Sequence, residues 1–402
     1  MKTEIITQDI KKAAGIIRAG GLVAVPTETV YGLAGNGLDE KAVNDIYEVK
    51  GRPAIKPLSL MVPGPEALDM YCLDVPDAAR ALAKKYWPGP LTIVLKAKEY
   101  IPSVVLAGGS TVGLRCPDHP LTLALLEESS LPLAAPSANP SGATSPNTAQ
   151  DVSGFFVGKI DAIMDGGPCG IGLESTIIDM SSVPYKILRE GALSESEIAD
   201  ALADELRIIG ITGGTGCGKT TALNVLDEMG ALILDCDLVY HQLLASSKAL
   251  LDDLNEAFPG SVQQGRVDTK ALGKIVFSDD NELIKLNYIT HKHILAEIRL
   301  RLKEHAMNGG TLAALDAIEL ISSGMGEICF TTLAVLADRE LRAQRIMARD
   351  SVSREYALMR IDAQKPDSYF IENCEHVLYN NAGAEEFKLE CTRLFKEVLN
   401  NG

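Results

Sequence analysis

The stretch 207–221, RIIGITGGTGCGKTT, most constrains what this chain can fold into. Its apolar run ends in closely spaced glycines and Gly-Lys-Thr, which is typical of a buried strand leading into a phosphate-binding loop and a helix. Glycines let backbone N–H groups turn inward around phosphate oxygens, and the helix N-terminus adds its dipole. Lys219 would reach the β- and γ-phosphates of ATP, and the Thr220 hydroxyl would hold Mg²⁺. The residues predicted to bind nucleotide in this loop are Gly216, Cys217, Gly218, Lys219, Thr220 and Thr221.

Such a loop normally follows the first strand of its domain, although 206 residues precede it here. A chain of 402 residues is long enough for two or three domains. The segment 194–206, SESEIADALADEL, is typical of a short acidic helix with a serine N-cap, and a fresh strand–helix–strand pattern starts after it. We therefore predict one domain over 1–193, a linker over 194–206 and a second domain over 207–402.

Short apolar runs alternate with helical patterns in both predicted domains, which favours an α/β fold. We expect a twisted mixed α/β domain first and a phosphate-loop domain with a parallel sheet second. Strands are expected at 21–25, 58–62, 91–97, 112–115, 131–135 and 175–180, and then at 207–212, 231–237, 311–317, 329–337 and 376–381. Helices are expected at 39–50, 76–87, 119–129, 219–230 and 338–364.

Charge and cysteine usage argue against several classes of protein. The net charge of -16 disfavours general binding to DNA or to a membrane surface, because phosphate groups attract basic faces. The eight cysteines form no C-x-x-C pair, so reduced thiols in the cytoplasm are expected rather than a zinc site. The sequence shows no signal-peptide pattern and no apolar run of membrane-spanning length.

Two carboxylates close the second expected strand of the second domain, in LDCDLVYH. Asp235 and Asp237 point to opposite sides if the strand persists. A carboxylate at the carboxyl end of a strand can face the phosphates and take a proton from a hydroxyl group. Asp237 could equally be a helix N-cap, and the residues alone leave both readings open. A guanine-reading N-K-x-D is absent from this half, which disfavours a GTPase.

The second half resembles the dephospho-CoA kinases over about residues 207–400. The resemblance rests on four ordered segments: the loop with GALILDCDLVYHQLL, then LNYITHKHI at 286–294, a lid-like 342–364 with Arg345, Arg349, Arg360 and Gln364, and HVLYNNAG at 376–383. Two departures stand out. Lys292 follows His291 where the family commonly has proline, and 314–324 lacks the usual Pro-Leu-Leu, although Asp316 and Glu319 keep its acidic character.

The resemblance implies transfer of the γ-phosphoryl group of ATP to the ribose 3′-hydroxyl of dephospho-CoA, beneath a helical lid. It makes Asp237 the general base, with Lys219 and one or more lid arginines neutralising the transferring phosphoryl. Arg345 and Arg349 lie one helical turn apart and share a face. A mixed-charge helix is usually a solvated face, so which arginine reaches the phosphates stays open.

Three loops of the first half concentrate polar residues: 26–35, 50–59 and 135–146. Each alone is readily an ordinary solvated loop or turn. Together, cations and hydroxyls on loops at strand ends favour a site for an anionic small molecule.

These loops resemble the YrdC family of threonylcarbamoyl-AMP synthases, whose hallmark K-x-R…S-x-N is here Lys50-Gly-Arg52 and Ser137-Ala-Asn139. TVGLRCPDHP at 111–120 and GLESTIID…ILREGAL at 172–193 extend the resemblance over residues 5–193. Met61 and Ala135 stand where some members have histidine and threonine. The resemblance implies L-threonine binding by Thr29, Arg115 and Ser175, and ATP binding by Lys50, Arg52, Lys56, Thr111, Ser137, Asn139, Ser145 and Arg189.

The implied reaction joins L-threonine, bicarbonate and ATP into threonylcarbamoyl-AMP and pyrophosphate, with Mg²⁺ accompanying ATP in both halves. The product would feed a tRNA threonylcarbamoyl-transfer machinery, without tRNA contact by this half being required. Two rival readings remain at this point. The first half could be a non-catalytic RNA- or nucleotide-binding module that regulates a kinase, or the second half could phosphorylate another small molecule.

Overall fold

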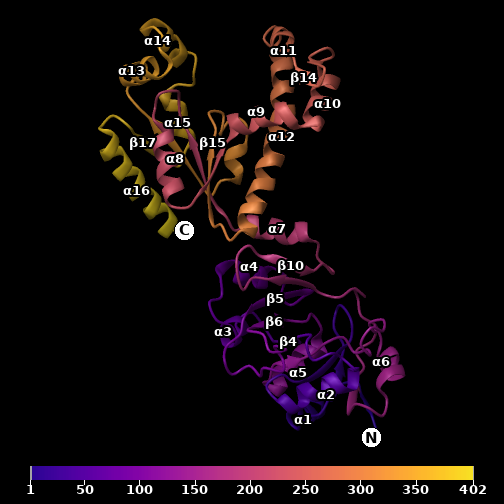
Figure 1. Cartoon of the computed structure of the whole chain (residues 1–402). Helices are drawn as coiled ribbons and strands as arrows, with labels where there is room; N and C mark the ends of the chain where they lie inside the picture. Colours follow the sequence, from indigo (N-terminus) through magenta and orange to yellow (C-terminus); the bar gives the residue numbers. More distant parts are fainter. Residues whose placement is uncertain (1, 402) are drawn as a thin grey trace. The chain divides into compact units, whose positions relative to one another are not determined.

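The computed structural model describes residues 2–401 and divides the chain into two compact units. The first unit comprises residues up to 205 together with 307–309, and the second comprises 206–306 and the residues from 310 onward (Figure 1). None of the helices within residues 2–401 combines the length and the apolar character that crossing a membrane requires.

The first unit is built on a mixed sheet with the strand order β1-β8-β2-β3-β7-β4-β6-β5-β9-β10. Pairs β4/β6 and β5/β9 are parallel, whereas β5/β6 and β9/β10 are antiparallel. This confirms the mixed α/β class, and the segment predicted as the loop 26–35 contributes β3. The strands are β1 Glu4–Ile6, β2 Val23–Val25, β3 Gly32–Asn36, β4 Ser59–Met61, β5 Leu91–Lys96, β6 Thr111–Arg115, β7 Leu133–Ala134, β8 Ala162–Met164, β9 Thr176–Asp179 and β10 Lys186–Arg189.

Apolar helix faces close the core of this unit. Ile17 of α1 and Leu125 of α5 are fully buried and pack with Val23 of β2 in one cluster. The burial of such side chains is what holds helices against a sheet. The helices are α1 Ile10–Arg18, α2 Glu40–Lys50, α3 Ala67–Tyr71, α4 Asp77–Tyr86, α5 Pro120–Ser129, α6 Ala149–Phe156 and α7 Glu195–Ala203.

The segment predicted as a linker forms α7, which packs on α4 within the first unit. Its N-terminus has a capping box in which Ser194 and Glu197 bond each other's backbone, as the S-x-x-E pattern predicts. Ile198 and Leu202 are buried, and Lys85 of α4 pairs with Asp204 at 3.1 Å. The apolar face of this acidic helix is therefore covered rather than free.

The second unit has a five-stranded parallel sheet in the order β12-β15-β11-β16-β17, as expected for a phosphate-loop domain. On one face α8 and α16 bury Leu226, Phe387 and Phe395 against it. On the other face α15 contributes Phe370. The strands are β11 Arg207–Thr212, β12 Leu232–Asp235, β15 Leu312–Asp316, β16 Thr331–Leu336 and β17 His376–Tyr379, with a separate hairpin of β13 Val262–Gln263 and β14 Arg266–Val267.

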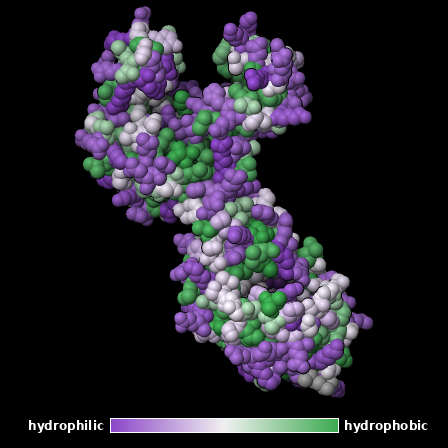
Figure 2. All heavy atoms as spheres, in the orientation of Figure 1, coloured by the Kyte–Doolittle hydropathy of each residue, from purple (hydrophilic) through white to green (hydrophobic). Residues whose placement is uncertain are grey.

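Two helical extensions rise from the carboxyl ends of these strands (Figure 1). One follows β12 and contains α9 to α12, and the other follows β16 and contains α13 and α14. Figure 2 shows a hollow between them, with apolar residues toward the sheet. The predicted helix 338–364 is two helices, because Ser351 has φ 55° and ends the first. The helices are α8 Lys219–Glu228, α9 Cys236–Ser246, α10 Lys248–Ala257, α11 Thr269–Val276, α12 Asp280–Met307, η1 Met325–Ile328, α13 Arg339–Asp350, α14 Arg354–Asp362, α15 Asp367–Asn373 and α16 Ala384–Asn401.

Candidate active sites

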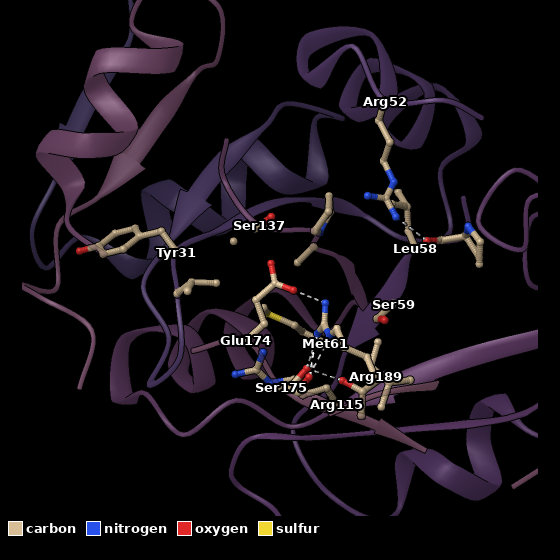
Figure 3. Close-up of a pocket in the computed structure, with 17 residues that line it drawn as sticks. Tyr31, Arg52, Leu58, Ser59, Met61, Arg115, Ser137, Glu174, Ser175 and Arg189 are labelled. Carbon is tan, nitrogen blue, oxygen red and sulfur yellow. Dashed lines mark hydrogen bonds and ion pairs between the residues drawn. The ribbon is translucent and has the colours of Figure 1, made fainter. Parts of the chain in front are cut away.

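A cavity of about 230 Å³ opens in the first unit where several strand ends and loops meet (Figure 3). Arg115 ends β6, Ser137 follows β7, and Ser175 immediately precedes β9. Arg189 ends β10, and Arg52 follows the αL residue that closes α2. All five of these predicted site residues line the cavity. Residues from five separate segments are thus brought to one place by the sheet.

Arg115 is the deepest cation of this cavity. It is 7% exposed, and its Nη2 donates to Thr29 Oγ1 at 2.6 Å and to Glu28 Oε1 at 2.8 Å. Its Nε is buried and has no hydrogen-bond partner among residues 2–401. An unpaired buried guanidinium N–H is costly, so this donor indicates a missing acceptor. Glu28, which sequence reasoning missed, also accepts the Asp118 backbone N–H at 3.0 Å and fixes Arg115 in place.

Ser175, the third residue predicted to bind threonine, lines the same cavity. Its hydroxyl lies 2.9 Å from Thr92 Oγ1 and accepts from Arg189 Nη2 at 3.2 Å. Thr92 lines the cavity as well, although sequence reasoning did not single it out. The hydroxyl groups are therefore pre-arranged by their neighbours rather than free to rotate.

The hallmark residues Lys50 and Asn139 shape the loop behind the cavity. Lys50 Nζ donates to the backbone carbonyls of Ser137 and Asn139, the latter at 2.5 Å. Burial lowers the Lys50 pKa to about 8, and the charge of Arg52 acts in the same direction. The Asn139 amide donates to Ala143 O at 2.6 Å, while none of the described residues donates to its buried Oδ1. Neither side chain lines the cavity, so both serve the geometry of the Ser137 loop.

The remaining predicted ATP-binding residues fall into different places. Ser145 donates to Glu174 Oε1 at 3.0 Å, and Glu174, which sequence reasoning missed, lines the cavity. Lys56 is exposed, and Thr111 begins β6, on the same face as Arg115 but at the far end of the strand. Neither Lys56 nor Thr111 is among the residues that line the cavity.

The phosphate-binding loop of the second unit runs from β11 into α8, as predicted. Gly213, Gly216 and Gly218 have φ of 135°, 81° and 99°, a region that side-chain-bearing residues rarely adopt. A Cβ on Gly218 would also overlap the side-chain amide of Asn380, which donates to Cys217 O at 2.9 Å. Lys219 is the first residue of α8, so it lies where the helix dipole attracts anions. Thr220 and Thr221 follow it in the first turn.

Asp316 lies beside this loop at the end of β15, the strand between β12 and β11. It pairs in register with Ile211 on one side and Asp235 on the other. Its Oδ1 is 3.6 Å from Lys219 Nζ, yet it finds no hydrogen-bond donor in the part of the chain that the structure describes. Burial raises the Asp316 pKa, partly opposed by the Lys219 charge.

The structure separates the two aspartates that close the second strand. The strand does not persist: β12 ends at Asp235 and α9 begins at Cys236, so alternation between strand faces does not apply. Asp235 is the helix N-cap, because its carboxylate accepts the Leu238 N–H at 3.0 Å. Asp237 lies exposed in the first turn of α9. It lines a second cavity of about 250 Å³ with Tyr240, Asn287, Thr290, His291, Ile318, Glu319 and Met325, among others.

The two lid arginines predicted as catalytic are placed differently. Arg345 donates to Gly216 O at 3.3 Å and to Asn380 O at 3.0 Å, so it lies against the phosphate-binding loop. Arg349 is exposed and pairs with its neighbour Asp350 at 2.7 Å. Arg360 binds the same carboxylate at 2.6 Å, and these two arginines lower the Asp350 pKa to about 2. The structure brings Arg345 to the loop and leaves Arg349 engaged elsewhere.

Two further lid residues hold the loop and were not predicted as site residues. Arg342 is 5% exposed and donates to Thr215 O at 3.0 Å and to Gln364 Oε1 at 2.8 Å. Gln364 in turn accepts the Thr215 N–H at 2.9 Å and donates to its hydroxyl at 3.0 Å. Both lie inside the lid-like segment 342–364, which is the signal that could have identified them.

Comparison with known families places both units. The model of the Sua5/YciO/YrdC family, described as telomere recombination, matches residues 15–191, and the dephospho-CoA kinase model matches 207–386. Over 180 residues the chain is 37% identical to a putative threonylcarbamoyl-AMP synthase of Methanocaldococcus jannaschii, covering 45% of this chain and 84% of that protein. Over 182 residues it is 34% identical to a dephospho-CoA kinase of Carboxydothermus hydrogenoformans, covering 45% and 88%.

The chain belongs to both families. Both resemblances predicted from the motifs are thereby confirmed. The synthase-family unit is also 50% identical over 199 residues to a longer threonylcarbamoyl-AMP synthase of Pyrococcus abyssi, covering 50% of this chain. The chain spans little more than half, 52% to 58%, of the length of that relative and two further synthases.

The residues that depart from the two family patterns lie in or near the cavities or inside a helix. Met61 and Ala135 both line the first cavity. Their side chains lie close to Gly32, because a Cβ at Gly32 would be 3.1 Å from Met61 and 3.6 Å from Ala135. In the kinase-family unit Lys292 is inside α12 and pairs with Asp253 at 3.2 Å. A proline there would remove a helix hydrogen bond, so lysine lets α12 run through 28 residues. Within 314–324, Ile318 and Glu319 line the second cavity in place of the missing Pro-Leu-Leu.

Proposed function

We propose that the chain is a bifunctional enzyme with two separate ATP-using sites. The first unit would form threonylcarbamoyl-AMP from L-threonine, bicarbonate and ATP, and the second would phosphorylate the ribose 3′-hydroxyl of dephospho-CoA. The observation that carries the proposal is that each unit has its own cavity and its own cations for phosphate. Arg52, Arg115 and Arg189 line the first cavity, and Lys219 of the phosphate-binding loop pairs with Asp316, the residue before Ala317 of the second cavity.

In the first unit the threonine amine would combine with CO₂ derived from bicarbonate to give a carbamate. A carbamate oxygen then attacks the α-phosphorus of ATP, the bond to the bridging oxygen breaks, and pyrophosphate leaves. The unpartnered Nε of Arg115 supports its assignment to the threonine carboxylate. Thr29 and Ser175 would orient the amino acid, while Arg52, Ser137 and Arg189 would hold the phosphates.

This reaction requires no strong general base, because the carbamate oxygen already carries negative charge. The cavity agrees with that requirement. Glu174, the acidic residue among those that line it, is bound to Arg189 and Ser145. Glu28, just behind Arg115, is bound to that arginine. Because both carboxylates are held by these partners, the cavity favours positioning and charge stabilisation.

In the second unit the 3′-hydroxyl of dephospho-CoA would attack the γ-phosphorus of ATP, and ADP would leave. We assign Asp237 to the hydroxyl proton, because it lines the cavity next to the carboxyl edge of the sheet, where ligands of parallel sheets bind. Lys219 would neutralise the transferring phosphoryl, as phosphoryl transfer requires. Arg345 would hold the loop from its lid side, and Arg349 would reach the nucleotide only after leaving Asp350.

The residues of the second unit fit Mg²⁺ accompanying ATP. The buried Asp316 Oδ1 lacks a hydrogen-bond donor, and carboxylate and hydroxyl oxygens are ligands that Mg²⁺ prefers. Asp316 and Thr220 would hold the ion with phosphate oxygens. When bound, Mg²⁺ neutralises phosphate charge and aids departure of ADP. In the first unit Mg²⁺ would arrive with ATP, and no group of three metal-ligating residues is found within residues 2–401.

A product assay on the intact chain tests the proposal. With ATP, L-threonine and bicarbonate we expect threonylcarbamoyl-AMP and pyrophosphate, and with ATP and dephospho-CoA we expect CoA and ADP. If ATP binds to the first unit without forming an adenylate, that unit is a regulatory nucleotide-binding module instead. If the second unit ignores dephospho-CoA yet phosphorylates another acceptor in a screen, it is a kinase for a different small molecule.

A further inference from the structure

Glu174 stands between Ser145 and Arg189, two residues that the family resemblance assigns to ATP binding. Its Oε1 accepts from Ser145 Oγ at 3.0 Å, and its Oε2 is ion-paired with Nη1 of Arg189. Figure 3 shows its carboxylate within the cavity, pointing toward an arginine. About two fifths of each side chain of the ion pair is exposed, 37% for Glu174 and 40% for Arg189. The carboxylate thus occupies an anion position that remains accessible from the cavity.

Other cations surround the same carboxylate. Burial lowers the pKa of Lys50 and of Arg52, and the negative charge of Glu174 partly opposes that lowering. Arg52 lines the cavity, and Lys50 lies directly behind it. Carboxylate and phosphate oxygens are recognised by the same charged donors. A triphosphate entering the cavity would therefore meet donors that already hold an anion.

A role as a metal ligand is less consistent with this geometry. Both Glu174 oxygens are already engaged, and the described residues contain no group of three side chains able to hold a metal around it. A single carboxylate paired with arginine is a poor divalent-cation site, since such ions take several oxygen ligands.

We propose that Glu174 is an internal anion that holds Ser145 and Arg189 in their binding geometry and is displaced by the phosphates of ATP. The inference rests on the proposed function of the first unit. Displacement exchanges one anion for another, so it leaves no cation unpaired, and the released carboxylate lies close to solvent. Glu174 is a positioning residue: it fixes Ser145 and Arg189 before ATP arrives, but it also weakens nucleotide binding because the phosphates must displace it.

Nucleotide binding by Glu174→Gln tests this directly. The full chain carries Lys219→Ala in every sample, so that the second unit contributes little ATP binding. Calorimetry then measures the dissociation constants of ATP, pyrophosphate and adenosine with and without Mg²⁺. We expect ATP and pyrophosphate to bind about fivefold more tightly, the usual worth of a half-exposed ion pair, and adenosine to be unchanged. Glu190→Gln, an exposed neighbour of Arg189 with the same change of charge, is the matched control.

Each outcome decides the inference. Unchanged or weaker ATP binding in Glu174→Gln overturns it, and weakening that occurs only with Mg²⁺ would make Glu174 a metal ligand instead. Equal tightening in Glu190→Gln would reduce the effect to net charge and also overturn it. If Glu174→Gln unfolds, Glu174→Asp replaces it, because aspartate is one methylene shorter and bridges Ser145 and Arg189 poorly. Tighter ATP binding is again expected, and its absence counts against the proposal. ATP binding absent from the Lys219→Ala parent would instead refute the proposed function.

Discussion

Replacing Asp237 by asparagine separates the two roles open to the carboxylates at the end of β12. Asp235 is already committed, because it caps α9 through the Leu238 N–H. Asp237 caps nothing and lines the proposed acceptor cavity. Asp237→Asn keeps the size and polarity of the side chain but removes its basicity. We therefore expect transfer to dephospho-CoA to fall while ATP binding survives, since Lys219 and the loop amides are unchanged.

The expected loss of activity greatly exceeds the expected loss of stability. A positioned general base is worth about 10²- to 10⁴-fold in rate, which is about 3–5 kcal/mol of transition-state stabilisation. Removing one negative charge from the first turn of an exposed helix costs only about 0.3–1 kcal/mol of folding free energy. Asp235→Asn costs still less, because asparagine caps helices about as well as aspartate.

Single-turnover phosphoryl transfer and a nucleotide titration on both variants are the decisive assays. We expect a loss of at least about 10²-fold for Asp237→Asn and near-normal transfer for the cap variant Asp235→Asn. Near-normal transfer in Asp237→Asn would refute the assignment of the base, and the partly buried Asp316 would become the next candidate. Equal losses in both variants would instead indicate that the start of α9 has been distorted.

The remaining predictions concern the lid contact and a buried lysine. Arg342→Met should raise the KM for ATP of the kinase reaction about tenfold, because it frees Thr215 and hydrogen bonds from charged groups are worth about 1.5–3 kcal/mol. Steady-state kinetics measure the effect, with the exposed lid variant Arg339→Met as the control. An equal rise in KM in Arg339→Met would contradict the prediction. The folded-state Lys50 pKa of about 8 lies below the ordinary lysine pKa of 10.5, chiefly because the amine is buried. The unfolded chain therefore binds more protons between these pH values, and stability should rise with pH by up to about 3 kcal/mol. Chemical unfolding should show this rise in the native chain and not in Lys50→Met, whereas parallel curves would contradict it.

Features that depend on residues close in sequence were predictable. The phosphate-binding loop is specified by glycines that local backbone conformation requires, so its strand, loop and helix appear where 207–221 places them. The capping box of α7 follows equally from Ser194 and Glu197. The parallel sheet of the second unit follows from strands that alternate with helices.

Features that depend on the exact end of an element or on distant contacts were not predictable. The strand ends at Asp235 rather than Asp237, and that shift decides which aspartate is the cap. Arg342 reaches a loop residue 127 positions earlier, and Lys50 bonds a carbonyl 87 positions later. Composition and periodicity carry no information on such contacts, because they are created only when the sheet assembles.

The central claim is that one chain holds two independent active sites, and paired variants test it most directly. Lys219→Ala removes the cation of the phosphate-binding loop. Arg52→Ala removes a partly buried cation of the first cavity, whose acceptors, the Lys56 and Pro57 carbonyls, belong to exposed residues. Both products are measured on the intact chain of each variant. We predict that Lys219→Ala loses CoA formation by roughly 10²-fold or more and keeps threonylcarbamoyl-AMP formation, and that Arg52→Ala does the reverse. Loss of both products in either folded variant would contradict the account.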